Sequence, residues 1–357
     1  MTARPRAADV ARAAGVSVTA VSFVLNGNDS GNISAATKER VLRAAAELGY
    51  RPNRLAQSLR RQRSHVVGLL TDSIASSPFA GRLLAGAADR AGSDGYVLLV
   101  HDSHGDARRD QGAVDEMLAR QVDGLVYATM GLRELESLPL TPLPLVLANC
   151  YQSPDAHPSV VPDDAGGARI AAETLLLAGH RRITMLGGTP PRASETGFQA
   201  GNVSGPVRER AFRTATRAAG LRSPDVHVRT VGWQIDDGYR GALRVLADGP
   251  GHALPAHSRP SGIVAVNDRV AAGAMLAAAS LGIRVPDDLS IVGFDDQEGL
   301  AAFLVPGLTT LALPHEAMGH RAVDLLFARL GGEDLPATRE LLPCPLVERG
   351  TVAPPLA

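Results

Sequence analysis

Residues 9–26, DVARAAGVSVTAVSFVLN, constrain this chain more than any other stretch, because they read as two short helices joined by a tight turn. Gly15 ends the first helix, since glycine adopts turn conformations that other residues resist. Ser17 or Thr19 can cap the second helix, along which apolar residues recur at helical spacing. In a helix-turn-helix unit of this kind, the second helix lies in the major groove of DNA. The stretch therefore predicts a DNA-reading unit.

The charge of the chain is unevenly distributed, although its net charge is only −1 at pH 7. Residues 1–63 contain eleven Lys and Arg against four Asp and Glu, a net charge of +7, so the remaining residues carry −8. A basic segment attached to an acidic body is typical of a module that binds a polyanion such as DNA. The charge pattern and the helix-turn-helix pattern thus favour the same interpretation.

The composition indicates an ordinary globular chain without export or membrane features. At 357 residues, with 45% hydrophobic and 20% charged residues, the chain has the length of two or three domains. Its two cysteines, Cys150 and Cys344, are too few for a disulfide framework, and residues 1–10 lack the apolar core of a signal peptide. No apolar run approaches the roughly 20 residues needed to span a bilayer. We therefore expect a cytoplasmic protein with no membrane partner.

A third helix and a basic connecting segment follow the helix-turn-helix pattern. Ser34 can cap this helix, which Gly49 ends. Its expected buried stripe consists of Val41, Leu42, Ala45 and Leu48. Pro52 prevents further helix, and NRLAQSLRR from residue 53 predicts a short helical stretch with a basic end. We therefore place a helix-turn-helix DNA-binding domain at residues 1–50 and a hinge helix with its linker at residues 51–63.

From residue 66 onward, short apolar runs alternate with helical patterns. Strands are expected at residues 66–70, 96–100, 123–128, 144–148, 182–188, 226–231, 262–267 and 289–295. Helices are expected at residues 81–92, 111–120, 166–178, 207–219, 237–247, 269–281 and 319–330. Continuously apolar strands that alternate with helices predict parallel sheets covered on both faces. Ligand sites in such sheets lie at the carboxyl ends of the strands.

The chain carries a series of specific motifs that extends nearly from end to end. The motifs in the first 60 residues are DVARAAGVS, VSFVLNG, IS-x-x-T-x-x-RV and LGYRPN-x-x-A-x-x-L. Those in the remainder are AGHRRITMLGG (178–188), VNDRVAAGAMLAAASLGIRVPDDLSIVGFDD (266–296), PGLTTL (306–311) and LVERG (346–350). In their order and spacing these motifs resemble those of the lactose-repressor/galactose-repressor family of transcriptional regulators, so the resemblance is specific.

The resemblance implies an all-α head with a hinge helix, followed by an α/β core of two doubly wound parallel-sheet lobes similar to periplasmic sugar-binding proteins. The core, residues 64–357, would hold lobe 1 at about residues 64–163 and 314–339, and lobe 2 at about residues 164–310 and 340–357. The family also implies a transcription factor, expected to be a repressor, that binds a palindromic operator as a homodimer under the control of a small-molecule effector. We expect no tetramer, because the C-terminal TVAPPLA carries no heptad pattern.

The motif positions of the family place the base-reading residues at the start of the second helix. These are Val18, Thr19 and Phe23, with Ser17 and Ser22 suited to phosphates. Threonine hydrogen-bonds several bases, and valine and phenylalanine contact the methyl group of thymine. Many members of the family have arginine where this chain has Phe23, which leaves the operator sequence open. The alternative is that Phe23 packs between the helices.

Leu59 in the hinge matches the leucine with which the family intercalates from the minor groove of DNA. Such an apolar wedge unstacks two base pairs and bends the duplex, and Ala56 would face the groove beside it. Further candidates for contacts with phosphates or groove edges are Asn53, Arg54 and Gln57. Taken alone, Leu59 is better explained as an ordinary helix residue, but its distance from Pro52 and Asn53 matches the family and favours the wedge.

Seven residues at matching motif positions are expected to line an effector cleft between the lobes. They are Asp72, Phe79, Asn149, Arg208, Trp233, Asn267 and Asp295. Carboxylates accept hydrogen bonds from adjacent hydroxyl groups, and amides both donate and accept them. The planar guanidinium of arginine donates several hydrogen bonds in a fixed geometry. Trp233, the only tryptophan, can stack on the apolar face of a sugar ring. These side chains fit a sugar or polyol, and the alternative is a purine or nucleoside sandwiched between Phe79 and Trp233.

Several of these residues also have a plain structural interpretation. Trp233 can belong to the core, Asp295 to a solvated turn and Arg208 to a helix surface. The RERAF motif around Arg208 has Ala211 where the family has glycine. Weaker candidates for the cleft are Asp163, Thr129 and His315.

Two other classes of protein share parts of this pattern. A solute-binding protein without a regulatory role would have the same core, but the basic head and the absent signal peptide argue against it. An enzyme acting on a sugar would need a nucleophile or a metal constellation, and the sequence has no G-x-S-x-G elbow, Walker A loop or H-E-x-x-H motif. We therefore expect no enzymatic activity, no cofactor and no bound metal ion.

Overall fold

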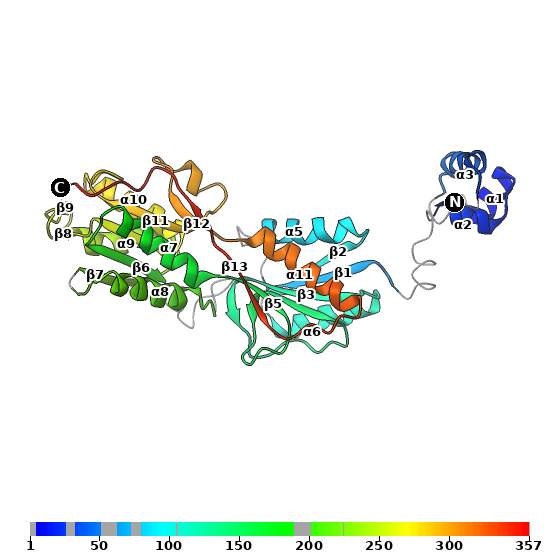
Figure 1. Ribbon diagram of the computed structural model, residues 1–357, viewed down its shortest axis with the longest axis horizontal. Helices are drawn as coiled ribbons and strands as arrows, with labels where there is room; N and C mark the ends of the chain where they lie inside the picture. Colours follow the sequence, from blue (N-terminus) through cyan, green and yellow to red (C-terminus); the bar gives the residue numbers. More distant parts are fainter. Residues whose placement is uncertain are drawn as a thin grey trace. The chain divides into compact units, whose positions relative to one another are not determined.

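The chain divides into two compact units, Met1–Ser64 and His65–Ala357. The structure, a computed structural model, describes residues 5–25, 33–50, 63–72, 80–104, 106–188, 201–223 and 225–356. Figure 1 labels the helices and strands of both units. The described part of the first unit contains helices only, whereas the second contains two six-stranded sheets with helices on both faces of each and a small two-stranded sheet.

The first unit is built from three short helices, which are α1 (Ala7–Ala14), α2 (Val18–Leu25) and α3 (Ala35–Glu47). Gly15 closes α1 in the left-handed conformation, with φ of 65°, as the tight turn requires. The Ser17 hydroxyl accepts a hydrogen bond from the amide of Ala20 at 3.1 Å, so Ser17 rather than Thr19 caps α2. Ser34 caps α3 as the sequence predicted.

Small and β-branched side chains fill the core of this unit. They are Val10, Ala11, Ala14, Val21, Val24, Val41, Ala44 and Ala45. The predicted stripe of α3 is correct for Val41 and Ala45 but wrong for Leu42 and Leu48, whose side chains are 46% and 40% exposed. Ala44 takes their place, because positions i, i+3 and i+4 share one helix face, whereas Leu42 is turned by about 100° from Val41.

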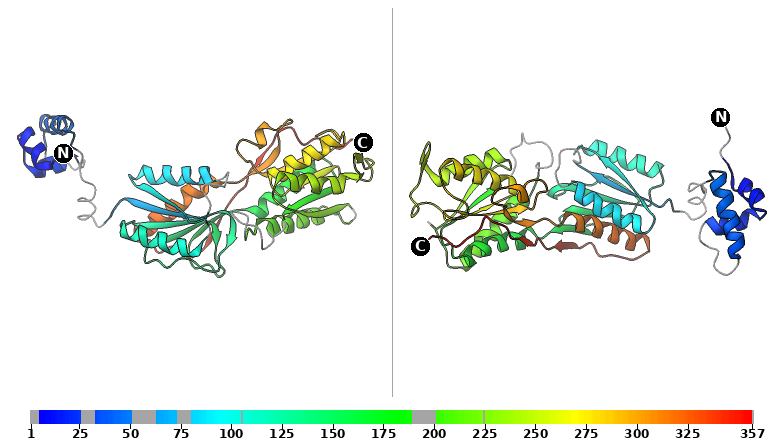
Figure 2. Two further views of the ribbon diagram at one scale, coloured as in Figure 1. Left: turned by 180° about the vertical axis from the view of Figure 1, so that it is seen from behind. Right: turned by 90° about the horizontal axis from the view of Figure 1, so that it is seen from above.

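Lobe 1 of the second unit contains a six-stranded parallel sheet in the order β13-β5-β4-β3-β1-β2. Its strands are β1 (Val66–Thr71), β2 (Val97–Asp102), β3 (Gly124–Glu134), β4 (Leu145–Tyr151), β5 (Ser159–Pro162) and β13 (Arg339–Leu342). Helices cover both faces: α5 (Ala80–Ser93) and α11 (His315–Leu330) lie on one, and α6 (Ala107–Ala119) on the other. The central strands are therefore buried on both sides, which is why they read as continuous apolar runs (Figure 2).

Lobe 2 repeats this arrangement with a sheet in the order β14-β12-β11-β10-β6-β7, parallel except for β14. Its strands are β6 (Ile183–Gly188), β7 (Val226–Val231), β10 (Gly262–Ala265), β11 (Ser290–Asp295), β12 (Thr309–Ala312) and β14 (Leu346–Val347). Its helices are α9 (Ile235–Leu246) and α10 (Asp268–Ser280) on one face, and α7 (Asp164–Leu177) and α8 (Ser204–Ala218) on the other. A small hairpin of β8 (Ala247–Gly249) and β9 (His252–Ala253) and a short helix η1 (Ala301–Phe303) complete it. The predicted class, a helical head with two doubly wound parallel-sheet lobes, is confirmed.

The chain crosses between the lobes three times, after β5, after β12 and after β13. The third crossing corrects the predicted boundary, because residues 340–342 belong to lobe 1 and not to lobe 2. They lie in β13, where Glu340 stands opposite Val160 of β5 in parallel pairing. A four-residue strand at the edge of a sheet has too little periodicity to reveal its lobe, and only its pairing partner does.

No single helix among those the structure describes is long and apolar enough to cross a bilayer. Helices α1 and α2 reach that length and composition only when taken together, across a bend of 102°.

Candidate functional site

The outer face of α2 presents the residues predicted to read DNA. Ser17, Val18 and Thr19 are exposed at the start of the helix, and Ser22 is half-buried. Phe23 is 41% exposed and stands apart from the core of the head, to which the other face of α2 contributes. Phe23 therefore does not pack between the helices, and its ring is accessible from outside.

Six of the predicted contact residues lie outside the described ranges. They are Asn53, Arg54, Ala56, Gln57 and Leu59 of the hinge and Phe79 of the cleft. Their roles remain predictions.

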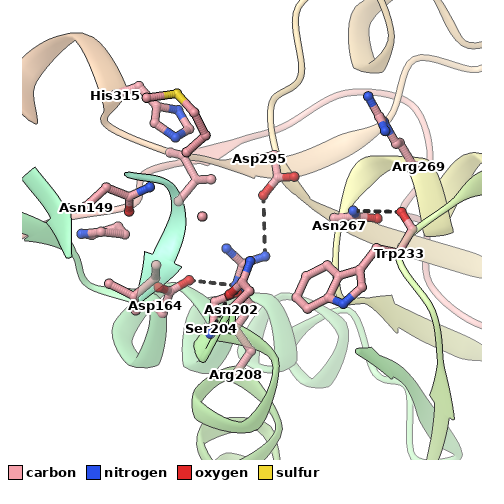
Figure 3. A pocket seen from close by; sticks show the side chains of 15 residues that line it. Asn149, Asp164, Asn202, Ser204, Arg208, Trp233, Asn267, Arg269, Asp295 and His315 are labelled. Atoms are coloured by element: carbon pink, nitrogen blue, oxygen red, sulfur yellow. Dashed lines mark hydrogen bonds and ion pairs between the residues drawn. The ribbon is translucent and has the colours of Figure 1, made fainter. Parts of the chain in front are cut away.

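A pocket lies between the two lobes, next to the carboxyl ends of strands from both sheets (Figure 3). The enclosed space of the pocket is about 30 Å³, and counting the open solvent beside it brings the empty space to about 480 Å³. Five of the seven residues predicted for the cleft line it, namely Asn149, Arg208, Trp233, Asn267 and Asp295. Further polar residues in its wall are Asp164, Asn202, Ser204, Arg269 and His315.

Arg208 of α8 holds the charged groups of the pocket together. Its Nε donates to Oδ1 of Asp164 at 2.6 Å, and its Nη1 donates to the carbonyl of Val266 at 2.5 Å and to Oδ1 of Asp295 at 3.4 Å. The guanidinium also lies 3.6 Å from the centroid of the Phe294 ring. Burial disfavours the charged guanidinium, but the carboxylates of Asp164 and Asp295 outweigh this and raise the pKa of Arg208. Arg208 is therefore a buried, paired cation and not a surface charge.

Asp164 carries a buried oxygen with no hydrogen-bond partner. Its side chain stands in the first turn of α7, and while Oδ1 accepts from Arg208, Oδ2 is buried and unpaired. Burial raises the pKa of Asp164, and the charge of Arg208 opposes that shift. Leaving a buried acceptor unsatisfied costs about 1–3 kcal/mol, more for a charged group. Because Asp164 lines the pocket, a donor from a bound molecule would remove this cost.

Asp295 and Asp296 point in different directions although they are neighbours in the sequence. Asp295 ends β11 with φ of 112°, a backbone conformation that favours glycine, and its side chain is buried in the pocket wall. Burial raises the pKa of Asp295 well above its usual range, against the opposing charge of Arg208. Asp296 pairs instead with Arg349 at 2.7 Å. The interpretation of Asp295 as part of a solvated turn is therefore wrong.

Trp233 belongs both to the core of lobe 2 and to the wall of the pocket. Its indole lies against Gly188 and Gly205, where an added Cβ would come within 2.7 and 3.3 Å of the ring. Asn267 fixes this segment from the other side: its Oδ1 caps α10 at the amide of Val270, and its Nδ2 donates to the carbonyl of Trp233 at 3.1 Å. Asn267 thus positions the tryptophan as well as lining the pocket.

Two arginines, a histidine and two carboxyl groups are among the side chains that line the pocket. Arg269 donates to the amide oxygens of Gln234 and Gln297, at 3.0 and 3.1 Å, and so adds a second cation beside Arg208. Burial, with the nearby charges of Arg82 and Arg208, lowers the pKa of His315 to about 3, so its imidazole is neutral near pH 7. Among the described lining residues, two arginines therefore face the two carboxylates of Asp164 and Asp295.

Asp72 is not among the described residues that line the pocket. Its Oδ1 accepts a hydrogen bond from the amide of Met130 at 3.0 Å, and its Oδ2 lies 3.0 Å from Nη2 of Arg133. Of the weaker candidates, Thr129 donates to the carbonyl of Asn149, Asp163 caps α7, and only His315 lines the pocket.

The sequence alone did not single out Asp164, Asn202, Ser204 or Arg269. In the VPDD segment, two adjacent aspartates compete for the inward position, and the weaker candidate named there was Asp163. The start of α7 decides between them, since Asp163 caps the helix and Asp164 faces Arg208. Arg269 stands in the VNDR motif, so its neighbour Asn267 was the available signal for it.

Comparison with known proteins connects this pocket and the head to one family. The description "Bacterial regulatory proteins, lacI family" matches residues 8–53, and "Periplasmic binding protein-like domain" matches residues 172–352. The sucrose operon repressor of Escherichia coli is 33% identical over 351 residues, which cover 96% of this chain and 98% of that protein. The chain belongs to the lacI family of bacterial regulatory proteins.

Other relatives agree with this assignment over the whole length. The ribose operon repressor of Escherichia coli strain K12 is 30% identical over 353 residues, covering 96% of this chain and 98% of that protein. The crystal structure of the lac repressor dimer bound to operator and the anti-inducer ONPF is similar with a TM-score of 0.73 and 27% identity, over 98% of this chain and all of that one. The predicted resemblance to this family of DNA-binding regulators is confirmed.

Proposed function

We propose that this lacI-family protein is a repressor that binds a palindromic operator as a homodimer and changes its affinity for that operator when a sugar binds between its lobes. The relatives named for the sucrose and ribose operons support a sugar-linked regulator. Effector binding and operator binding would then be coupled, so that each alters the affinity for the other by the same factor.

The observation that carries the effector proposal is the unpaired Oδ2 of Asp164 in the wall of the pocket. A sugar hydroxyl would donate to it, while the amides and guanidinium groups around it serve the neighbouring hydroxyls. Trp233 offers an apolar ring face for stacking.

A purine or nucleoside remains the second candidate for the effector, because Trp233 would also stack on a base. The second aromatic wall expected for a base is Phe79, which lies outside the described residues, and Trp233 is the only Phe, Tyr or Trp among the described lining residues. Sugar hydroxyls use more of the wall's polar groups than a base does, so the sugar is favoured.

The accessible residues of α2 support the DNA-binding part of the proposal. Val18, Thr19 and Phe23 would contact base edges, and Ser17 and Ser22 phosphates, while the hinge residues would complete the contact from the minor groove. One head reads a short half-site, so a symmetric operator needs two chains.

Large exposed apolar side chains on lobe 2 support a homodimer. Phe303, the last residue of η1, is 78% exposed, and Val305, two residues later in the chain, is 93% exposed. Exposed apolar residues that cluster on a surface mark sites of protein–protein contact, and we infer that a second copy of the chain covers these two. Light scattering should give the mass of two protomers, and a mass near four would contradict the dimer.

Calorimetry on the full chain tests the effector class directly, with one panel of neutral mono- and disaccharides and one of nucleobases and nucleosides. We expect a sugar to bind, and Asp164→Asn to weaken it strongly, because the variant exchanges an acceptor-only carboxylate for an amide. Asp163→Asn is the matched control, since that neighbour caps α7 outside the pocket lining. Binding of a nucleobase and of no sugar would favour the second candidate.

A truncated chain that begins at residue 64 tests the division of labour. We expect it to lose operator binding and to keep the affinity of the pocket for its sugar. Specific operator binding by this core would contradict the proposal.

A further inference from the structure

The pairing of β3 with β4 is interrupted by a bulge next to the pocket. Its pairing with β4 is regular up to Ala128 and resumes at Arg133, so that residues 129–132 stand opposite the single residue Asn149. Met130, Gly131 and Leu132 of this bulge form part of the pocket wall. A bulge at such a place bends the strand and redirects its side chains, and such irregularities concentrate near functional sites.

Three groups of lobe 1 fix the shape of the bulge. The hydroxyl of Thr129 donates to the carbonyl of Asn149 at 2.7 Å, and the side-chain amide of Asn149 donates back to the carbonyl of Thr129 at 2.9 Å. Asp72, at the end of β1, accepts from the amide of Met130 at 3.0 Å. The bulge is therefore a fixed feature of lobe 1.

The ion pair between Asp72 and Arg133 anchors the far end of the bulge. The two side chains approach within 3.0 Å, and both are largely buried. Burial raises the pKa of Asp72, and the charge of Arg133 opposes that shift. Substituting either Asp72 or Arg133 alone should destabilise lobe 1, because the remaining partner stays buried without its counter-charge.

The bulge reaches lobe 2 through backbone contacts. The amide of Val203 donates to the carbonyl of Leu132 at 2.9 Å, and Arg133 forms an antiparallel bridge with Asn202. Asn202 in turn accepts hydrogen bonds from the amide and hydroxyl of Ser204, the first residue of α8. The three covalent crossings join the lobes elsewhere in the chain, so this contact is a separate, breakable link beside the pocket.

We propose that residues 129–132 act as a latch that holds the lobes closed over the pocket, with Asp72 and Arg133 as the positioning residues that set it. Entry or release of a ligand requires the hydrogen bond between Leu132 and Val203 to break. The inference depends on the proposed function only in treating this pocket as the effector site. It also gives Asp72 a role through the latch in place of a direct ligand contact.

Trp233 makes the latch measurable without any effector. It is the only tryptophan of the chain, it is nearly buried, and it lines the pocket. Quenching of its fluorescence by acrylamide therefore reports how often the pocket opens. In Asp72→Asn and in Arg133→Gln we expect the quenching constant of the full chain to rise at least about threefold, since couplings of this kind change populations by about 5- to 150-fold.

A matched control separates the latch from general loosening of lobe 1. Asp155 and Arg339 form an ion pair of the same kind, 2.9 Å apart and half-buried, and neither is among the described lining residues. Asp155→Asn should leave the quenching constant unchanged. Combining Asp72→Asn with Arg133→Gln should add little to either alone, because both break the same link.

Val203→Pro tests the link between the lobes directly, because proline has no amide hydrogen to donate to Leu132. Val203→Ala keeps that donor and is its control. We expect quenching to increase in the proline variant and not in the alanine variant, and this pair decides the matter if Asp72→Asn does not fold. Unchanged quenching in Val203→Pro, or an equal rise in Asp155→Asn, would overturn the latch.

If no sugar in the calorimetry panel binds, the proposed function is contradicted, but the quenching measurement still tests the latch.

Discussion

Phe23 on α2 and Arg208 in the pocket are both large side chains at the centre of a candidate functional surface, yet their surroundings are opposite. Phe23 is 41% exposed and contributes nothing to the core of the head, whereas Arg208 is 3% exposed and binds groups from three other segments of lobe 2. The residues of α2 hold their places through a local helix and its cap. Those of the pocket depend on tertiary contacts, so changes there should affect binding and stability together.

The largest expected effect is that of Arg208→Ala. The variant leaves Asp164 and Asp295 buried without their cation, and breaking a buried ion pair from one side costs about 3–5 kcal/mol of the free energy of unfolding. Chemical denaturation followed by Trp233 fluorescence measures this. Arg213→Ala on the same helix removes an exposed pair with Glu209 and should change the free energy by less than about 1 kcal/mol. Equal losses in both variants would remove the distinction between the two regions.

Phe23→Ala should weaken DNA binding without lowering the stability of the head. Because the ring would supply an apolar contact with a thymine methyl group, we expect its loss to relax the sequence preference and to weaken binding to the best duplex selected from a random library. Thermal unfolding of the head should stay the same, since the ring is outside its core. Val21→Ala on the buried face is the control, and it should lower the stability of the head. A Phe23→Ala head that unfolds more easily would show that the ring packs after all.

The pH dependence of stability should carry the signature of His315. Its pKa is lowered to about 3 in the folded chain from 6.5, so the folded state excludes a proton that the unfolded state binds. The stability that neutral His315 contributes to the folded state is fully present above pH 6.5. As the pH falls from 6.5 toward 3, the free energy of unfolding decreases by about 1.4 kcal/mol per pH unit. His315→Gln should flatten this slope in denaturation experiments between pH 6.5 and 5. His104→Gln, at an exposed site, should not.

The smallest expected effect is at the cap of α2. Ser17→Ala removes the acceptor for the amide of Ala20 and should lower the stability of the head by about 1 kcal/mol. Thr19→Ala should have little effect, because Thr19 is not the cap. Similar losses in both variants would mean that the start of α2 is held by something other than this hydrogen bond.

The head was predictable from the sequence because its signals are local. Gly15, Ser17 and Ser34 act on the residues next to them, and the error at Leu42 and Leu48 came from choosing the wrong helix face. In the core, long apolar strands were recognisable, whereas short edge strands such as β13 were not, since pairing with β5 defines it. Asp72 and Asn149 were both expected in the cleft, at family motif positions near the ends of lobe 1 strands. In the structure Asn149 lines the pocket, whereas Asp72 contacts Met130 and Arg133 at the bulge of β3.

The sequence by itself determined the family, the parallel-sheet lobes and five of the residues that line the pocket, because these depend on periodic apolar patterns and on residues at the ends of strands. The tertiary structure decided which of two adjacent aspartates turns inward, which carboxylate oxygen stays unpaired, and that the helix face carrying Phe23 is open. It also joined β3 to the segment before α8, about 70 residues away along the chain. Contacts of that range arise only when the two lobes fold against each other, and no local pattern of residues encodes them.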